Sequence, residues 1–170
     1  HLLGKLALYD FFKKANKNVV LEPYLATLSQ RPDLLVQDRD RTYAIEFQCS
    51  TIDLDLVSKR TSGYIQHGIH PYWLLNTSGK YYEETNCTKM ISLTKFEQQF
   101  IVRNGAHSYL LTFHPQTKTF FYYTHLIHFQ TNQFIAEIQR LPIQYQTFPF
   151  FQPKKMSFSK FLPLIKLYKK

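Results

Sequence analysis

Residues 31–48 restrict the fold of this chain more than any other segment. Two runs of strongly β-forming residues flank the polar residues 38–41, a pattern that predicts a β-hairpin with a four-residue loop. A symmetric loop of this length pairs Gln37 with Thr42. That pairing fixes which side chains of the two strands share a face of the sheet, because side chains alternate along a strand.

Three polar side chains fall on one face in this register. Asp33 lies directly opposite Glu46, and Gln48 projects from the same face two residues further along. Directly opposed residues have Cβ atoms about 4.5–5.5 Å apart, so the two carboxylates repel each other unless a proton or a cation intervenes. Carboxylate and amide oxygens suit a hard divalent cation, and the pattern therefore predicts a magnesium site.

Two interpretations of this face remain open on sequence alone. Acidic residues on a strand are often simply solvated, and a slip of one residue in the register would reverse every side chain. Against this, Glu46 lies within residues 43–49, an otherwise apolar run typical of a buried central strand. A carboxylate in such a strand is costly without a partner.

Glu22 extends the pattern to a third strand. Residues 19–25 are predicted to form that strand, and Pro23 favours an edge position because it cannot donate a ladder hydrogen bond. A symmetric turn over residues 26–29 places Glu22 opposite Asp33, as a third metal ligand. The connection can also close in other ways, which would leave Glu22 outside the site.

The order of predicted elements is α-β-β-β-α-β. A helix is expected over residues 2–14 before the three strands, a second helix from a capping box at Ser50 to about His67, and a strand over residues 71–76. The crossover helix permits a parallel last strand. The chain is thus predicted to be an α/β protein with a mixed sheet, with its core in residues 1–78.

Residues 79–170 are predicted to form a basic, aromatic-rich α+β elaboration packed on that core. A short helix is expected over residues 94–102 and a hairpin from strands 108–113 and 119–124. A basic amphipathic helix is expected over residues 157–169.

The composition of the chain favours some classes of binding partner over others. The formal net charge of +9 favours polyanions such as nucleic acid over an anionic membrane surface. Cys49, expected to be buried, and Cys87 are the only cysteines, which fits a reducing cytosol and predicts a cytoplasmic protein. No apolar run is long enough to span a membrane. The chain begins at His1 without an initiator Met, so a preceding segment is expected.

Several local motifs occur together with this element order. They are His1-Leu-Leu-Gly-Lys5, Arg31-Pro-Asp33, Ala44-Ile-Glu-Phe-Gln-Cys-Ser50, Arg60-Thr61 with Tyr64, and Pro71-Tyr-Trp-Leu74. In this combination, residues 1–78 resemble the nuclease-like domain of the competence protein CoiA family, within the PD-(D/E)XK nuclease superfamily of restriction-endonuclease-like folds.

The resemblance implies a metal-dependent DNA nuclease that acts in DNA uptake or recombination during competence, with uptake or recombination proteins as possible partners. Asp33 and Glu46 would hold Mg²⁺, or Mn²⁺ in its place, and Gln48 stands where the superfamily most often has Lys. A neutral amide performs the role of that Lys only in part. A non-catalytic DNA-binding module and, more distantly, a protein–protein adaptor are the alternatives.

Four further residues are candidate DNA contacts. Arg60 and Tyr64 lie four apart on the second helix and hence on one face, where Arg60 would clamp a phosphate. The alternative for Arg60 is a surface ion pair with Asp53 or Asp55. His1 and Lys5 share a face of the first helix, and simple solvent exposure is their alternative.

Overall fold

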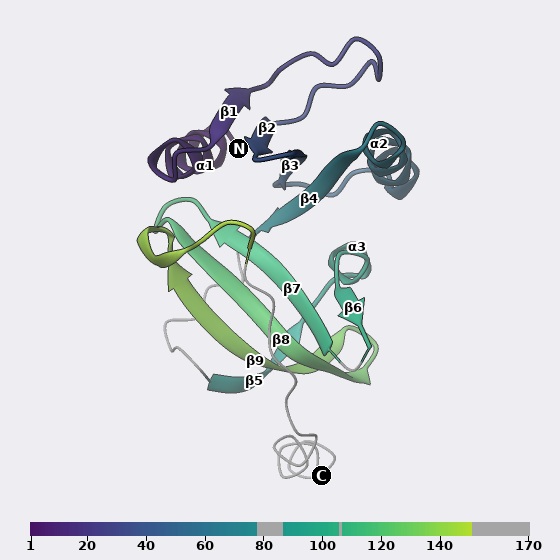
Figure 1. Ribbon diagram of the computed structural model, residues 1–170. Helices are drawn as coiled ribbons and strands as arrows, with labels where there is room; N and C mark the ends of the chain where they lie inside the picture. The colour runs from purple at the N-terminus through teal and green to yellow at the C-terminus, as the bar shows by residue number, and fades with distance from the viewer. Residues whose placement is uncertain (78–86, 106, 151–170) are drawn as a thin grey trace. The chain divides into compact units, whose positions relative to one another are not determined.

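The computed structural model describes residues 1–77, 87–105 and 107–150, and it confirms the mixed α/β class. The chain divides into two compact units (Figure 1). The first contains residues 1–77 together with 113–118, and the second contains the described residues of 87–112 and 119–150. The α-β-β-β-α-β order predicted for the N-terminal half is confirmed in the first unit.

The first unit opens with helix α1 (Leu2–Lys14) and the antiparallel strands β1 (Asn18–Leu21), β2 (Leu34–Asp38) and β3 (Arg41–Gln48). Strand β1 is at the edge of the sheet, as predicted. It ends four residues before the predicted Leu25, because Glu22 adopts a left-handed conformation (φ 49°) and Pro23 cannot continue the ladder.

The register of the β2–β3 hairpin is confirmed, whereas its loop is shorter than predicted. Gln37 pairs with Thr42, and pairing continues to Asp38 and Arg41. Only two residues therefore form the turn, and Arg39 takes a positive φ of 58°. The register was insensitive to this error, because a four-residue and a two-residue symmetric loop align the same strand residues.

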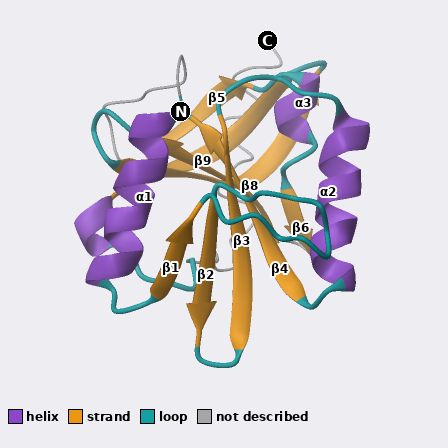
Figure 2. Cartoon of the chain, turned by 90° about the horizontal axis from the view of Figure 1, so that it is seen from above, coloured by secondary structure: helices purple, strands orange, loops and turns teal. Residues whose placement is uncertain are grey.

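Helix α2 (Leu54–Gln66) and strand β4 (Ile69–Asn76) complete the core of this unit. The helix begins at Leu54 and not at Ser50 as predicted, because Asp53 is the N-cap and its side chain accepts a hydrogen bond from the Asp55 amide. Strand β4 runs parallel to β3, as the crossover helix permits, and Trp73 is the register partner of Glu46. Figure 2 shows α1 and α2 on either side of strands β1–β4.

The close approach of α1 to β3 depends on a glycine. A Cβ atom at position 4 would lie 2.1 Å from Cε1 of Phe47, so only Gly4 allows this contact. Leu8 and Phe12 of the same helix are fully buried, as are Leu34 and Ile45 of the hairpin. This packing fixes the first turn of α1 against the end of β3, where the candidate site lies.

The second unit contains an antiparallel sheet with an aromatic core. Its elements are β5 (Cys87–Ser92), α3 (Lys95–Gln98), β6 (Val102–Asn104), β7 (His107–His114, whose last two residues belong to the first unit), β8 (Thr119–Gln130), β9 (Gln133–Pro142) and a 3₁₀ turn (Ile143–Tyr145). The short helix and the pair of strands β7 and β8 were predicted, although α3 is shorter than the predicted residues 94–102 and β8 is longer than expected. The predicted helix over residues 157–169 lies outside the described residues.

Two further expectations concern the surface. Cys49 is exposed, which corrects the prediction that it is buried, because the buried part of β3 ends before it. Across the described residues, the helices are all too short or too polar to cross a membrane.

Candidate active site

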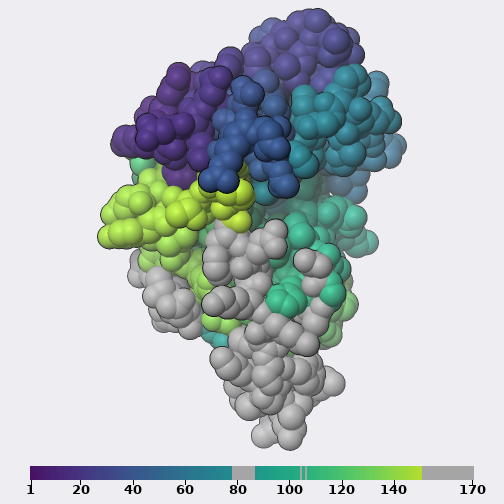
Figure 3. Space-filling model, viewed as in Figure 1, coloured from purple at the N-terminus to yellow at the C-terminus, as the bar shows by residue number. Residues whose placement is uncertain are grey.

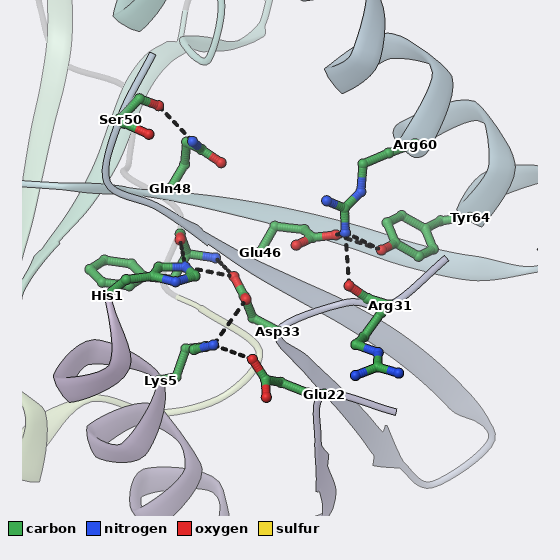
Figure 4. A network of polar contacts seen from close by, with 11 residues as sticks. His1, Lys5, Glu22, Arg31, Asp33, Glu46, Gln48, Ser50, Arg60 and Tyr64 are labelled. Carbon is green, nitrogen blue, oxygen red and sulfur yellow. Dashed lines mark hydrogen bonds and ion pairs between the residues drawn. The ribbon is translucent and has the colours of Figure 1, made fainter. Parts of the chain in front are cut away.

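Three carboxylates lie side by side where β1, β2 and β3 come together. The registers Leu21–Leu34 and Leu34–Ile45 place Glu22 beside Asp33 and Asp33 beside Glu46. The Glu22 amide also donates to the Asp33 carbonyl oxygen at 2.9 Å. Figure 4 shows the three side chains across the strands, with cationic side chains of α1 and α2 directed at them.

Lys5 neutralises two of the carboxylates. Its ammonium group donates to Glu22 Oε1 and lies 3.8 Å from Asp33 Oδ1. Lys5 is buried, with only 7% of its surface exposed, because α1 packs on the strands at this point. The hydrogen bond and charge of Lys5 lower the pKa of Glu22. Simple solvent exposure of Lys5 is therefore ruled out as an interpretation.

His1 contacts Asp33 from the start of the same helix. Its Nε2 lies 3.3 Å from Asp33 Oδ2 and 2.6 Å from the carbonyl oxygen of Phe47. The imidazole stacks on the Phe47 ring, with the planes 9° apart and the centroids separated by 6.0 Å. Asp33 Oδ2 also accepts a hydrogen bond of 2.7 Å from the backbone amide of Phe47 in β3. His1 and Lys5 thus reach the site together, from one face of α1.

Glu46 is the most deeply buried of the three carboxylates, with 4% of its surface exposed. Its Oε1 accepts hydrogen bonds from Arg60 and, at 2.5 Å, from the Tyr64 hydroxyl. Arg60 Nη2 also donates to the Arg31 carbonyl oxygen at 3.0 Å and lies 3.3 Å from the Tyr64 oxygen. Arg60 therefore pairs with Glu46, and with neither Asp53 nor Asp55, because the helix turns it inward to the sheet.

Burial dominates the electrostatics of the two central carboxylates. It raises the pKa of Glu46 from 4.5 to about 7, against the opposing effects of the Tyr64 hydrogen bond and the Arg60 charge. Burial also raises the pKa of Asp33, although the Phe47 amide and Lys5 act in the other direction. Both groups therefore hold a proton more tightly than free carboxylates, as expected where negative charges are brought together in a poorly hydrated place.

Gln48 lies on the same face of β3 as Glu46. Its amide nitrogen donates to the Ser50 carbonyl oxygen at 2.5 Å. Because the nitrogen is held in this way, the amide oxygen is directed to the other side, as Figure 4 shows. The structure thus brings Gln48 to the edge of the carboxylate cluster with an acceptor available.

The structure brings the predicted site residues together, but most of their hydrogen-bond partners were not predicted from the sequence. The backbone of Phe47, which links His1 and Asp33, was not predicted, and neither was the Arg31 carbonyl that holds Arg60. Gly4 was the available sequence signal for the contact between α1 and Phe47. A glycine indicates such a close contact, however, only once the helix has been placed on that strand.

The donor chemistry of Asp33 and Glu46 fits magnesium, which commonly binds through one or two carboxylates and completes its shell with water and phosphate oxygens. In the described part of the chain, however, no group of three or more His, Cys, Asp or Glu side chains is arranged to hold a metal ion. Glu22 is held by Lys5 and Glu46 by Arg60. A cation entering here would have to compete with these side chains.

Comparison with known proteins supplies the family. Residues 1–156 match the family described as competence protein CoiA, nuclease-like domain. The chain belongs to the CoiA family. It is also 34% identical over 143 residues to competence protein CoiA of Bacillus subtilis (strain 168).

The CoiA match extends beyond the segment that carried the resemblance. The motifs quoted from the sequence lie in residues 1–78, whereas the family match continues through most of the second unit. The alignment with the Bacillus subtilis protein covers 84% of this chain and 37% of that protein, so the chain spans little more than a third of its relative. No solved structure matches the chain.

Proposed function

We propose that this CoiA-family chain is a metal-dependent phosphodiesterase that cleaves DNA during competence, in uptake or recombination in the cytoplasm. The observation that carries the proposal is the placement of Asp33 beside Glu46, with Gln48 on the same face. The name of the Bacillus subtilis relative supports the role in competence. The net charge of +9 suits a polyanionic substrate.

Asp33 and Glu46 are the residues proposed to hold magnesium. When bound, magnesium supplies positive charge that stabilises a phosphoryl transition state and lowers the pKa of water. Burial raises the pKa of both carboxylates, that of Glu46 to about 7, so protons compete with a cation for these oxygens and cation binding is expected to strengthen as pH rises.

Three other side chains have proposed roles. Gln48, with its nitrogen held by the Ser50 carbonyl, would orient the attacking water through its amide oxygen. Arg60 lies at Glu46 and would shift to a phosphate oxygen of the DNA, since guanidinium groups bind phosphates well. His1 would contribute a hydrogen bond near Asp33, where its ring is already fixed by Phe47.

The test measures cleavage of labelled single- and double-stranded DNA with Mg²⁺ or Mn²⁺, alongside calorimetric titration with Mn²⁺. We expect cleavage by the parent, and loss of both cleavage and Mn²⁺ binding in Asp33→Asn. Asp38→Asn is the matched control, because Asp38 lies on the same hairpin but pairs with Lys17 away from the site. If Asp33→Asn cleaves DNA as the parent does, the site is wrongly assigned.

A non-catalytic DNA-binding module is the second candidate. It is favoured by one observation, namely that Lys5, His1 and Arg60 already occupy the carboxylates. In that case the parent would bind DNA, with an affinity that falls steeply with salt, yet would cleave neither substrate with either metal. Binding would then survive Asp33→Asn unchanged.

A further inference from the structure

A pocket of about 350 Å³ lies beside the carboxylate cluster, between the β1–β2 connection and helix α2. In Figure 3 the surface of this connection adjoins that of α2 at the top of the first unit. The volume is at the small end of the range of ligand sites, roughly 300–1,000 Å³. Arg60 lines the pocket and also contacts Glu46, so the pocket and the candidate active site share a residue.

The pocket combines apolar walls with positive charge. Leu28 comes from the connection and Leu56 from α2, and Leu56 is 46% exposed although it is a large apolar residue. Arg31, Lys59 and Arg60 supply three cationic groups. Among the described residues, neither the Arg31 guanidinium nor the Lys59 ammonium has a hydrogen bond or an ion pair, although the charge of Arg31 acts on Glu22, so both can contact an anion.

Two buried polar atoms of pocket-lining residues lack partners among the described residues. Oε1 of Gln30 can only accept a hydrogen bond, and Nε of Arg60 can only donate one. Buried polar groups in folded proteins are nearly always hydrogen-bonded, so these two atoms, which lie just beneath the pocket wall, favour a polar ligand that reaches them once the lining side chains shift. A ligand that carries both donors and acceptors would satisfy both atoms after small side-chain adjustments.

We propose that this pocket binds one unstacked nucleotide of single-stranded DNA next to the phosphate handled at Asp33 and Glu46. The base would lie between Leu28 and Leu56 with its polar edge toward Gln30 and Arg60, and its phosphate would meet Arg31 and Lys59. The proposal rests on the proposed DNA-directed function and adds the form of the substrate. A base within a duplex is paired and stacked, and it cannot enter such a pocket without being extruded.

The test compares binding of a fluorescent oligothymidylate, a duplex of equal length and an abasic strand of equal length, in EDTA to prevent cleavage. Leu56→Glu places a negative charge on the pocket wall. Leu54→Glu is its matched control, because Leu54 is 41% exposed on the same helix and does not line the pocket. Lys59→Gln is compared with Lys14→Gln, which removes the same charge from an exposed position on α1.

We expect Leu56→Glu to weaken binding of the single strand about tenfold, because it removes an apolar wall of the pocket and adds a negative charge beside the DNA, and Leu54→Glu to change it little. Lys59→Gln should weaken single-strand binding more than Lys14→Gln does. The parent should bind the abasic strand more weakly than oligothymidylate. Duplex binding should change no more in the pocket variants than in their controls.

Equal effects of Leu56→Glu and Leu54→Glu on the single strand would overturn the proposal, as would equal parental affinity for the abasic and thymidine strands. Neither result would contradict the proposed phosphodiesterase activity, which is tested separately by DNA cleavage. Conversely, a parent that binds single strands through the pocket but cleaves nothing would remove the catalytic proposal alone. A parent that binds no DNA at low salt would overturn both.

Discussion

Replacement of Glu46 by Gln should change how the stability of the fold depends on pH. The sign of the change shows whether burial or the contacts with Tyr64 and Arg60 dominate the pKa of Glu46. Glu46 is almost fully buried, and its pKa is raised from 4.5 to about 7. A carboxyl group whose pKa is higher in the folded state stabilises the fold less as pH rises, because the folded chain must release a proton that it holds more tightly than the unfolded chain does. The loss begins near pH 4.5 and is complete slightly above pH 7.

The size of this effect follows from the two pKa values. A difference between 4.5 and about 7 corresponds to about 3 kcal/mol of unfolding free energy lost between roughly pH 4 and pH 8. The attraction of Arg60 is already included, since it acts on the same pKa. Gln keeps the shape of the side chain and can still accept hydrogen bonds from Tyr64 and Arg60. We therefore expect Glu46→Gln to gain about 3 kcal/mol relative to the parent over this pH range.

Urea unfolding followed by tryptophan fluorescence measures the free energy of unfolding of the first unit at each pH. Trp73 is the only tryptophan in the chain, belongs to the first unit and is the register partner of Glu46. Other titrating groups are common to parent and variant, so their contributions cancel in the difference. Glu22→Gln is an informative control, because Lys5 lowers the pKa of Glu22 and its replacement should cost stability above pH 4.5.

The reasoning fails if the parent becomes more stable relative to Glu46→Gln as pH rises. That result would mean that the Arg60 and Tyr64 contacts outweigh burial and that the pKa of Glu46 is lowered in the folded state. Parallel curves for the two proteins would likewise show that burial leaves the pKa of Glu46 where it is in the unfolded chain. In either case Glu46 would not need to lose a tightly held proton before it binds a cation.

Two further substitutions test the frame of the site and its chemistry. Gly4→Ala should destabilise the first unit by about 1–3 kcal/mol in the same urea assay, because its Cβ would overlap the Phe47 ring. Gly63→Ala, also within a helix, should cost less since it meets only the movable end of Gln30, and equal costs would contradict the packing argument. Gln48→Ala should reduce metal-dependent cleavage about tenfold or more while leaving Mn²⁺ and DNA affinity nearly unchanged, and Gln48→Lys should preserve or raise it. Cleavage by Gln48→Ala at the parental rate would exclude the role proposed for Gln48.

The strand pairing was predictable because period-2 alternation and a short polar turn leave few alternatives. The placement of Asp33 opposite Glu46 followed from the pairing of Gln37 with Thr42, and the structure has that pairing. Element ends were less accessible to prediction. The end of β1 depends on a positive φ at Glu22, and the start of α2 depends on which of two acceptors, Ser50 or Asp53, caps it.

The partners of the site residues could not be predicted, because they depend on how helices pack on the sheet. Spacing alone indicated that His1 and Lys5 share a helical face, and that Arg60 and Tyr64 do. It did not indicate that one pair would be directed at Asp33 and the other at Glu46. The alternative considered for Arg60, a surface ion pair with Asp53 or Asp55, was wrong for this reason, since such a pair is the default only when the helix face is exposed.

The distribution of these partners has a consequence for how the site works. Asp33 and Glu46 are adjacent, yet their cations come from different helices: Lys5 and His1 from α1, and Arg60 from α2. Charge balance at the cluster therefore depends on both helices, and once Glu46 has lost its proton, a DNA phosphate that draws Arg60 away would leave the Glu46 charge unbalanced beside Asp33. That charge is what a divalent cation requires.

DNA and metal binding are thus expected to reinforce each other, and Mn²⁺ titrations with and without uncleaved oligonucleotide should give a higher Mn²⁺ affinity in its presence. An Arg60→Gln variant, in which no guanidinium has to move, should show a smaller gain, and a gain equal to that of the parent would refute the exchange of partners at Arg60.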